Sequence, residues 1–264
     1  MIFEGNLIKM NASNGKVVEY YLNLKEKIIH LNEIIGKPIK IEYTGQINCK
    51  KCGKITKKSF GQGFCYSCFI KAPEAEECVL RPELCRAHEG IARDLEFAKE
   101  HCLIDHYVYL ANTSSVKVGI TRHNQIPTRW IDQGANSAII FAKTSNRYEA
   151  GIIEVELKKY FPDKTNWRTM LSDINNDVNL IAEKSKAFNF LSEINKMYYY
   201  NEDLITEIKY PVIYFPKKIK SIDFDKVSFI NEKLIGIKGQ YLIFENGDVI
   251  NIRKHEGYYI KLEI

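Results

Sequence analysis

The pattern of apolar and polar residues predicts β-structure at both ends of the chain. Apolar and polar positions alternate at 7–10 and 17–22 around an Asn14-Gly15 turn, which is a typical hairpin signal, and a further strand is expected at 39–43. Comparable runs near the C-terminus lie at 212–215, 234–237, 241–244 and 249–252. Because a few strands alone make a poor sheet, we expect the two ends to pair into one small barrel.

The centre of the chain mixes strands and helices. Strands are expected at 106–111, 116–121 and 138–142, with a short helix at 129–134 and a longer one at 146–160. The resulting order is ββαβα. Two more helices are expected at 89–102 and 176–199. The second carries an apolar stripe that predicts a packing helix between the centre and the C-terminal sheet: Val178, Ile181, Phe188, Leu191 and Ile194.

These elements together predict an α+β protein with a small central domain. The expected segments are a β-rich N-terminal part at 1–48, a cysteine-rich module with a helix at 49–105, the ββαβα domain at 106–172, a bridging helix at 173–201 and a β-rich C-terminal part at 202–264.

Size and composition exclude several classes of protein. With 264 residues, of which 45% are hydrophobic and 27% charged, the chain can bury a sizeable core and is not of the disordered type. The net charge of +5 is a mild indication of an anionic partner. No apolar run approaches the roughly 20 residues that span a bilayer, and the N-terminus lacks a basic, apolar leader. We therefore expect a cytoplasmic protein without a membrane partner.

The cysteines carry the strongest chemical signal. Two C-x2-C pairs, Cys49 with Cys52 and Cys65 with Cys68, are separated by twelve residues, which matches structural zinc sites. In a cytosolic chain such clustering favours metal ligation over disulfides. Glycines at 53, 61 and 63 give the backbone the freedom that such turns need. The sequence predicts that these four thiolates bind one zinc ion.

A second metal site is predicted less specifically. Cys78, Cys85 and His88 supply three ligands, and the fourth is open among His101, Cys102 and His106. The alternative is that these side chains are ordinary core residues. A closed four-ligand site would stabilise a small module and would not itself catalyse a reaction.

Basic and aromatic residues interleave around the first cysteine module. The basic residues are Lys50, Lys51, Lys54, Lys57 and Lys58, and the aromatic ones are Phe60, Phe64, Tyr66 and Phe69. Lysines can neutralise phosphates while exposed rings stack on unpaired bases, so the combination suits nucleic acid, with RNA slightly favoured over DNA. The equally open alternative is a solvated lysine rim around a small aromatic core.

The central residues resemble a known family. Tyr107-Val108-Tyr109 and Lys117-Val118-Gly119 lie on the two expected strands, Arg129 on the short helix and Glu154 on the longer one. This pattern resembles the GIY-YIG nuclease domain, with Tyr109, Arg129 and Glu154 at its tyrosine, helix arginine and metal-binding glutamate, and Asn166 at a downstream asparagine. The resemblance implies phosphodiester hydrolysis with one Mg²⁺ or Mn²⁺ ion at Glu154. Each residue alone could equally be structural.

Lys117 departs from the family pattern, because the second signature tyrosine belongs at its position. A lysine could serve as a base only if burial lowered its pKa, and with Glu154 nearby we expect the opposite shift. The sequence therefore leaves three functions open. They are a metal-dependent endonuclease, a non-catalytic protein that binds tRNA or the ribosome through the same phosphate cradle, and an enzyme acting on a nucleotide.

Further polar residues are candidates for binding a phosphate or a base beside this site: Arg122, His123, Lys164, Asn166, Trp167 and Arg168. The whole chain, cysteine module included, is also similar to a bacterial family known only as a domain of unknown function, and this similarity supplies no activity.

Overall fold

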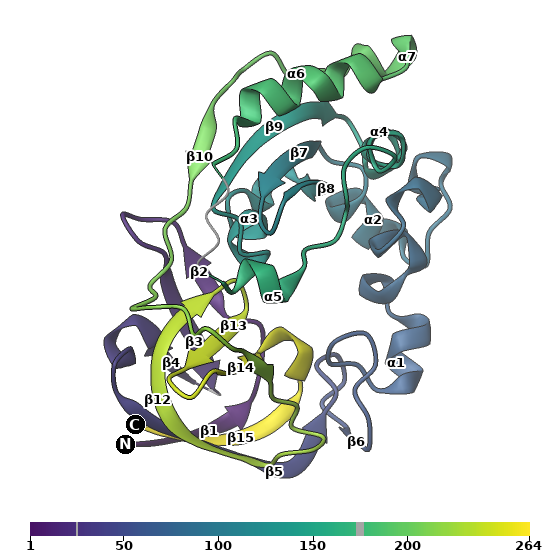
Figure 1. The fold of residues 1–264 in the computed structure, drawn as a ribbon. Coiled ribbons are helices and arrows are strands. Elements are labelled where there is room, and N and C mark those ends of the chain that lie inside the picture. The colour runs from purple at the N-terminus through teal and green to yellow at the C-terminus, as the bar shows by residue number, and fades with distance from the viewer. Residues whose placement is uncertain (25, 173–176) are drawn as a thin grey trace. The chain divides into compact units, whose positions relative to one another are not determined.

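A computed structural model describes residues 1–24, 26–172 and 177–264 (Figure 1). The chain forms two compact units. Unit 1 contains residues 1–70, 171–173 and 209–264, and unit 2 contains residues 71–170 and 174–208. Helices and antiparallel sheets occur in the same chain, so the expected α+β class is confirmed. The boundaries of the units differ from those of the five expected segments, since the segment 49–105 is divided after residue 70 and the segment 202–264 after residue 208.

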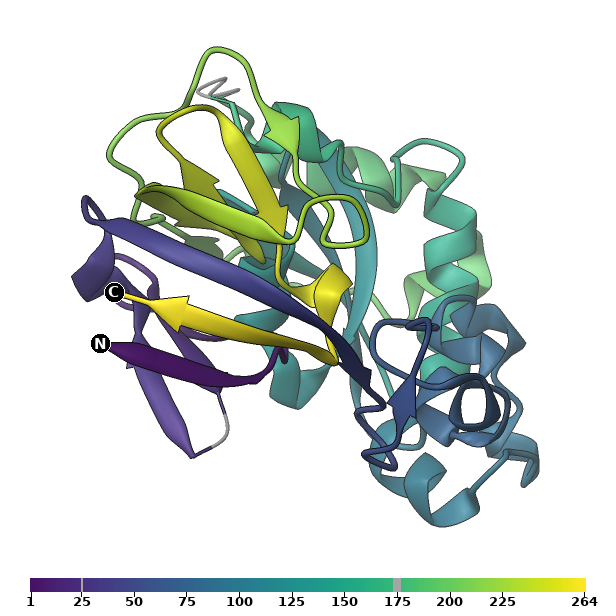
Figure 2. The same cartoon turned by 90° about the horizontal axis from the view of Figure 1, so that it is seen from below.

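Unit 1 is built on a mixed sheet that joins the two ends of the chain. In spatial order its strands are β1 (Ile2–Asn6), β15 (Tyr258–Glu263), β5 (Pro38–Asn48), β12 (Phe229–Lys238), β13 (Tyr241–Phe244), β14 (Asp248–Asn251) and β11 (Lys220–Ser221), with β6 (Ile55–Thr56) paired to the end of β5. The N-terminal strand β1 lies beside the C-terminal strand β15 (Figure 2). The expected pairing of the two ends is present. Among the described residues the sheet runs from β1 to β11 without a pairing that closes it into the expected barrel.

A smaller sheet in unit 1 contains the predicted hairpin. It consists of β2 (Asn11–Ser13), β3 (Glu19–Leu24) and β4 (Lys27–His30), and the Asn14-Gly15 turn lies between β2 and β3. The strand expected at 7–10 is wrong, although Leu7 and Met10 are fully buried. The Gln240 side chain accepts from the Met10 N–H (2.9 Å) and donates to its carbonyl (3.1 Å). A side-chain amide thus satisfies backbone groups that a strand would pair.

The other expectation that fails in unit 1 is the strand at 212–215, where only an isolated bridge from Val212 to Gly236 forms. Short 3-10 helices at η1 (Leu31–Ile34) and η7 (Arg253–His255) complete the unit.

Unit 2 contains the predicted ββαβα order. The strands β7 (His106–Asn112), β8 (Val116–Arg122) and β9 (Ser137–Thr144) alternate with α3 (Thr128–Asp132) and α4 (Arg147–Leu157). The sheet order is β10-β9-β7-β8, fully antiparallel, with β10 (Ile205–Glu207) added from the segment expected to be C-terminal β-structure. The Asn146 side chain caps α4 by accepting from the Glu149 N–H, which fixes where the helix begins.

One face of this sheet and the helices α4 and α6 (Leu180–Phe190) form a single hydrophobic core. It includes Val108, Leu110, Val118, Ile153, Leu157 and Leu180. The predicted long helix is wrong in length: α6 stops at Phe190, Leu191 is extended, and a separate turn α7 (Glu193–Lys196) follows. Its predicted start at 176 lies outside the described residues.

The break changes which face of the helix is buried. Leu180, Lys184, Ala187 and Leu191 face inward, whereas Ile194 of the predicted stripe is 75% exposed. The buried Lys184 ammonium donates to the Glu202 carbonyl (2.7 Å) and to the Asp203 carboxylate (3.0 Å). These two partners compensate the cost of burying the positive charge of Lys184.

The segment between the cysteine module and β7 consists of short helices. These are α1 (Tyr66–Lys71), the 3-10 helices η2 (Pro73–Ala75), η3 (Glu77–Val79), η4 (Pro82–Leu84) and η5 (Ala87–Glu89), and α2 (Leu95–His101). The helix expected at 89–102 therefore begins later. Gly90 is left-handed (φ +78°) and ends η5, and the Asp94 side chain caps α2 by accepting from the Phe97 N–H at 3.0 Å.

Two further short helices, η6 (His123–Gln125) and α5 (Trp167–Met170), complete unit 2. Of the helices in the described residues, none combines the length and the apolar character needed to cross a membrane.

Candidate metal centres and a buried charge cluster

The two predicted C-x2-C pairs come together in unit 1. The sulfur atoms of Cys49, Cys52, Cys65 and Cys68 all lie within 4.8 Å of one another, and those of Cys52 and Cys65 are 3.9 Å apart. A tetrahedral zinc ion with Zn–S bonds of about 2.3 Å needs sulfurs about 3.8 Å apart. The four cysteines could therefore hold a structural zinc ion with little adjustment.

Backbone hydrogen bonds shape this group, which we call the four-cysteine cluster. The Gly53 N–H donates to the Cys49 carbonyl (2.8 Å), and the Lys50 N–H donates to the Gly63 carbonyl (2.7 Å). Gly63 has φ +110°, and a Cβ there would lie 2.8 Å from the Lys50 Cδ atom. A side chain at position 63 would therefore displace the Lys50 side chain and would strain the backbone.

The four-cysteine cluster is electrostatically prepared for a cation. Burial raises the pKa of Cys49, but hydrogen bonds from the backbone N–H groups of Cys65, Cys52 and Lys51 outweigh it and lower the pKa to about 6. Burial and hydrogen bonds with the neighbouring thiols raise the pKa of Cys68 to about 12. One thiolate is thus present at neutral pH, and metal binding would release protons from the other thiols.

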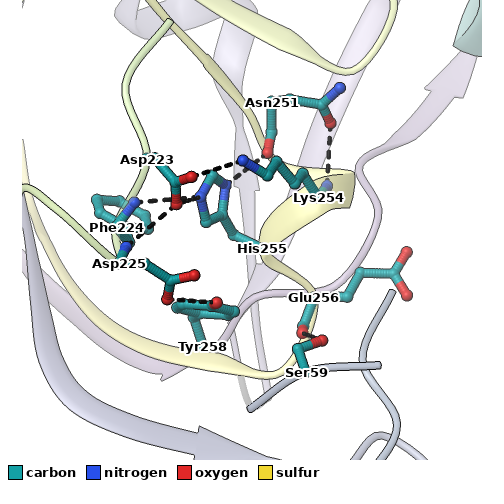
Figure 3. Close-up of polar contacts among 9 residues, drawn as sticks. All are labelled: Ser59, Asp223, Phe224, Asp225, Asn251, Lys254, His255, Glu256 and Tyr258. Atoms are coloured by element: carbon teal, nitrogen blue, oxygen red, sulfur yellow. Dashed lines mark hydrogen bonds and ion pairs between the residues drawn. The ribbon is translucent and has the colours of Figure 1, made fainter. Parts of the chain in front are cut away.

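A polar network of unit 1 surrounds His255, and Ser59 of the cysteine module contacts the neighbouring Glu256 (Figure 3). The buried His255 ring has Nδ1 2.8 Å from the Asn251 carbonyl oxygen, and its Nε2 lies 3.2 Å from the Phe224 nitrogen and 3.3 Å from a carboxylate oxygen of Asp223. The connection from β14 to β15 also binds the cysteine module. Glu256 pairs with Lys50 (2.7 Å), and its carbonyl accepts from the Ser59 hydroxyl (3.5 Å).

The aromatic residues of the module form its own small core. Phe64 is buried beneath the Lys50 ammonium, 4.5 Å from the ring centre, and Phe60 packs against Tyr66 and Phe69. Tyr66 is 60% exposed, and Lys51, Lys54, Lys57 and Lys58 lie on the surface. Nucleic-acid binding by Lys50, Lys51, Lys54, Lys57 and Lys58 stays a prediction.

Three cysteines also come together in unit 2. The sulfurs of Cys78, Cys85 and Cys102 lie within 4.8 Å of one another, and all three residues are buried. Cys102, which sequence reasoning left as one of three alternatives, is the third member of this three-cysteine cluster. It follows α2 directly, far along the chain from the first two. Three thiolates could hold a zinc ion and leave one coordination position for another ligand.

Two of the predicted histidine ligands, His88 and His101, contact aromatic rings and not the sulfurs. The His88 ring stacks on Tyr148 with ring centres 4.5 Å apart. The His101 ring stacks on Phe97 at 3.8 Å, and its Nδ1 lies 3.0 Å from the Phe97 carbonyl oxygen. Among the described residues neither belongs to the group of ligand atoms around Cys78. The C-x2-H spacing predicted that Cys85 and His88 bind the same metal ion. In the structure η5 directs the His88 ring toward Tyr148 of α4.

The four residues of the family resemblance lie together in one charge cluster of unit 2, in which Tyr109, Lys117 and Glu154 are buried and Arg129 is half-buried. In the β7–β8 pair Tyr109 lies opposite Gly119, and Lys117 lies opposite Ala111 on the same face of the sheet. Tyr109 is fully buried, and its hydroxyl donates to the Gln133 side chain at 2.9 Å. Burial raises the pKa of Tyr109, while the nearby Arg129 charge opposes that rise.

Lys117 behaves differently from our expectation. It is only 4% exposed, and burial together with the Arg129 charge lowers its pKa to about 8, although Glu154 and Asp163 act in the opposite direction. The expected upward shift is therefore wrong, because loss of hydration outweighs the nearby carboxylates. A minor fraction of Lys117 is neutral at pH 7, which is what a base requires.

Two residues that sequence reasoning missed complete the cluster. Lys158, one helical turn after Glu154, pairs with its carboxylate at 3.2 Å and with Asp163 at 3.5 Å. Burial raises the pKa of Glu154, and Lys158 opposes the rise. Lys117, Arg129 and Lys158 carry three positive charges, and the carboxylates that act on them are Glu154, Asp163 and Glu83, which reaches Lys158. The i,i+4 spacing of Glu154 and Lys158 was the available signal.

The residues predicted beside the cluster divide into two groups. The segment before α5 lies along the start of β8, where the Val118 N–H donates to the Pro162 carbonyl (3.0 Å) and the Asn166 N–H donates to the Ser114 hydroxyl (3.0 Å). The Asn166 side chain caps α5 by accepting from the Arg168 N–H (3.1 Å), and the Arg168 guanidinium stacks on Trp167 at 4.4 Å. Lys164 is exposed.

Arg122 and His123 lie at the opposite end of β8 from Lys117. Arg122 is close enough to Arg147 and Cys102 for their charges to act on it, and the His123 ring lies 3.3 Å from the Asp105 carbonyl. These two residues therefore do not join the charge cluster.

The comparison with family models gives a match over residues 36–260, to the family described as "Protein of unknown function (DUF2797)". The chain belongs to the DUF2797 family. The matched region includes both cysteine clusters and the charge cluster. A search of the curated proteins and a search of the solved structures each found no match. Membership in DUF2797 supplies no activity, and the GIY-YIG resemblance rests on the residue pattern alone.

Proposed function

We propose that the protein binds nucleic acid and that the charge cluster of unit 2 binds one backbone phosphate. The observation that supports this most is Lys117, a buried lysine that forms no ion pair among the described residues and lies close enough to Arg129 and Lys158 for their charges to act on it. A buried ammonium without an ion-pair partner is unfavourable unless an anion compensates its charge. A phosphate oxygen would supply that compensation.

The types of residue in the cluster suit a phosphodiester. The Arg129 guanidinium offers two parallel donors to phosphate oxygens, and the Lys117 and Lys158 ammonium groups offer point charges. Buried charges also interact more strongly than exposed ones, because little water screens them. The exposed lysines and Tyr66 of the cysteine module supply a second contact surface of the kind that unpaired RNA bases use.

A second candidate function is hydrolysis of that phosphodiester, and the lowered pKa of Lys117 favours it. Neutral Lys117 would accept a proton from the attacking water as the new P–O bond forms and the bond to the leaving oxygen breaks. Solvent would return a proton to the leaving oxygen. An Mg²⁺ or Mn²⁺ ion at Glu154 would stabilise charge on the phosphate, and binding it requires Lys158 to release the carboxylate.

Binding is tested with fluorescently labelled single-stranded RNA and DNA by anisotropy at several salt concentrations. We expect Lys117→Met to weaken binding about tenfold and to reduce the salt slope by about one, the effect of losing one phosphate contact. Lys238→Met is the matched control, since Lys238 is equally buried in unit 1 and burial lowers its pKa to about 8 as well. Equal affinities of wild type and Lys117→Met would contradict the proposal.

Hydrolysis is tested on the same oligonucleotides with Mg²⁺, with Mn²⁺ and with a chelator. Cleavage that disappears in Lys117→Met and in Glu154→Gln, while binding persists in Glu154→Gln, would support the enzyme. Intact oligonucleotides under all three conditions would contradict hydrolysis and leave the non-catalytic binding protein.

A further inference from the structure

The three-cysteine cluster of unit 2 is incomplete as a structural metal site. Structural zinc takes four protein ligands, and among the described residues only Cys78, Cys85 and Cys102 bring ligand atoms within 4.8 Å of one another in this unit. A pocket of about 230 Å³, lined by Cys78, Cys102 and Arg147, adjoins the sulfurs. This pocket gives a metal ion a route to the cluster.

His106 is a buried imidazole with one unused nitrogen. It is the first residue of β7 and is 1% exposed. Its Nδ1 lies 2.8 Å from the Ile104 carbonyl and so carries the proton, whereas its buried Nε2 has no hydrogen-bond partner among the described residues. Nε2 is therefore a buried acceptor without a donor, which is unfavourable. A metal-binding histidine has this same arrangement, with the other ring nitrogen donating to a carbonyl.

His106 lies close to Cys102 both along the chain and in space. Only three residues separate it from Cys102, and the two side chains are close enough for their charges to interact. Arg147 lies beside both and also donates to the Cys78 carbonyl at 3.3 Å. Zinc with three thiolates and one neutral imidazole has a net charge of −1, and the Arg147 guanidinium would neutralise it.

We propose that His106 is the fourth ligand of a zinc ion held by Cys78, Cys85 and Cys102. Because Nε2 is outside the group of sulfurs that lie within 4.8 Å, metal binding draws the ring toward them. The other two imidazoles stack on aromatic rings, His88 on Tyr148 and His101 on Phe97, and of the described histidines only His106 has a buried ring nitrogen without a hydrogen-bond partner. The site does not depend on whether the protein binds nucleic acid.

The test is cadmium NMR of the full chain with cadmium substituted for zinc, because the cadmium resonance separates four-sulfur sites from three-sulfur, one-nitrogen sites. We expect two resonances, one of each type. In His106→Cys the second resonance should move to the four-sulfur range, and in His106→Ala it should shift or disappear. The resonance of the four-cysteine cluster is the internal control for folding.

His101→Ala and His88→Ala are the matched control variants, since both histidines lie near the cluster but contact other rings. Both should keep the two resonances of the wild type. The proposal is overturned if the chain binds a single cadmium ion, if the second resonance is unchanged in His106→Ala, or if it is lost in His101→Ala or His88→Ala.

Discussion

The Tyr109 side chain lies directly over Gly119, its partner across the β7–β8 pair. A Cβ atom at position 119 would lie 2.6 Å from the Tyr109 hydroxyl oxygen and 2.8 Å from Cζ, distances that real Cβ atoms do not reach. The absence of a side chain at 119 therefore makes room for the phenol in the charge cluster. Glycine is required at position 119 because a Cβ atom would collide with the Tyr109 ring, and not because the backbone there needs a positive φ.

This contact predicts that Gly119→Ala destabilises the protein. Moving the buried ring aside should lower the free energy of unfolding by about 1–3 kcal/mol, as overpacking of a core usually does. Urea denaturation measures the change. In a Tyr109→Phe background the same substitution should cost less, since the closest atom is gone; an equal cost in both backgrounds would contradict the proposed clash.

Lys117 should titrate near pH 8, and an NMR titration of labelled lysine side chains tests this. Among the lysines that the structure describes, two are expected in that range, Lys117 and Lys238, and the variants Lys117→Met and Lys238→Met assign them. Since the ammonium form binds phosphate, nucleic-acid affinity should fall as pH rises through 8 in the wild type. A flat profile from pH 7 to pH 9 would argue against a role for Lys117.

The same shift predicts how stability depends on pH. The folded protein releases the Lys117 proton near pH 8, whereas the unfolded chain keeps it up to the ordinary lysine pKa of 10.5. Between these values the unfolded state binds more protons, so this residue makes stability rise with pH. Lys117→Met should gain up to about 3 kcal/mol over wild type at pH 7, and this gain should shrink toward pH 10. Urea denaturation at several pH values measures the difference.

The four-cysteine cluster predicts zinc-dependent stability. Elemental analysis should find zinc in the purified protein, and Cys49→Ser should lower both the zinc content and the thermal unfolding temperature, by roughly 5 °C or more. Ser67→Ala is the control, because Ser67 is exposed between Cys65 and Cys68. Protein without zinc, together with an unchanged melting temperature in Cys49→Ser, would disprove this metal site.

The network in Figure 3 predicts sensitivity to acid. Burial raises the pKa of Asp223, but hydrogen bonds from Lys254, the Asp225 N–H and His255 outweigh it and lower the pKa to about 2. The resulting stability is complete above about pH 4 and is lost as pH falls toward 2. Asp223→Asn should cost about 2 kcal/mol at pH 7 and little at pH 2.

Urea denaturation at the two pH values measures this difference. Lys254→Met provides the coupled variant, since Lys254 pairs with Asp223 at 2.6 Å. If Asp223→Asn costs the same at both pH values, Asp223 does not contribute through its charge.

The sequence by itself determined the features that depend on residues close together in the chain, namely metal-binding pairs, turns, strands and helices. The C-x2-C pairs predicted the four-cysteine cluster, because two residues of spacing turn both sulfurs of a pair to one side. The Asn14-Gly15 turn, the strand pair of Tyr109 and Lys117, and the helix of Glu154 follow from local periodicity in the same way. Local patterns failed where a distant partner decided the outcome, as at Met10, whose backbone is paired by Gln240.

Only the tertiary structure decided the chemistry of unit 2. The three sulfurs of the three-cysteine cluster come from segments separated by several short helices, and no spacing rule selects Cys102 over His88. The pKa of Lys117 depends on how completely the fold removes water from it and on the charges of Arg129 and Glu154, which reach it from other elements. Hydration and electrostatic energies are set by distances in space, so a linear order of residues does not contain them.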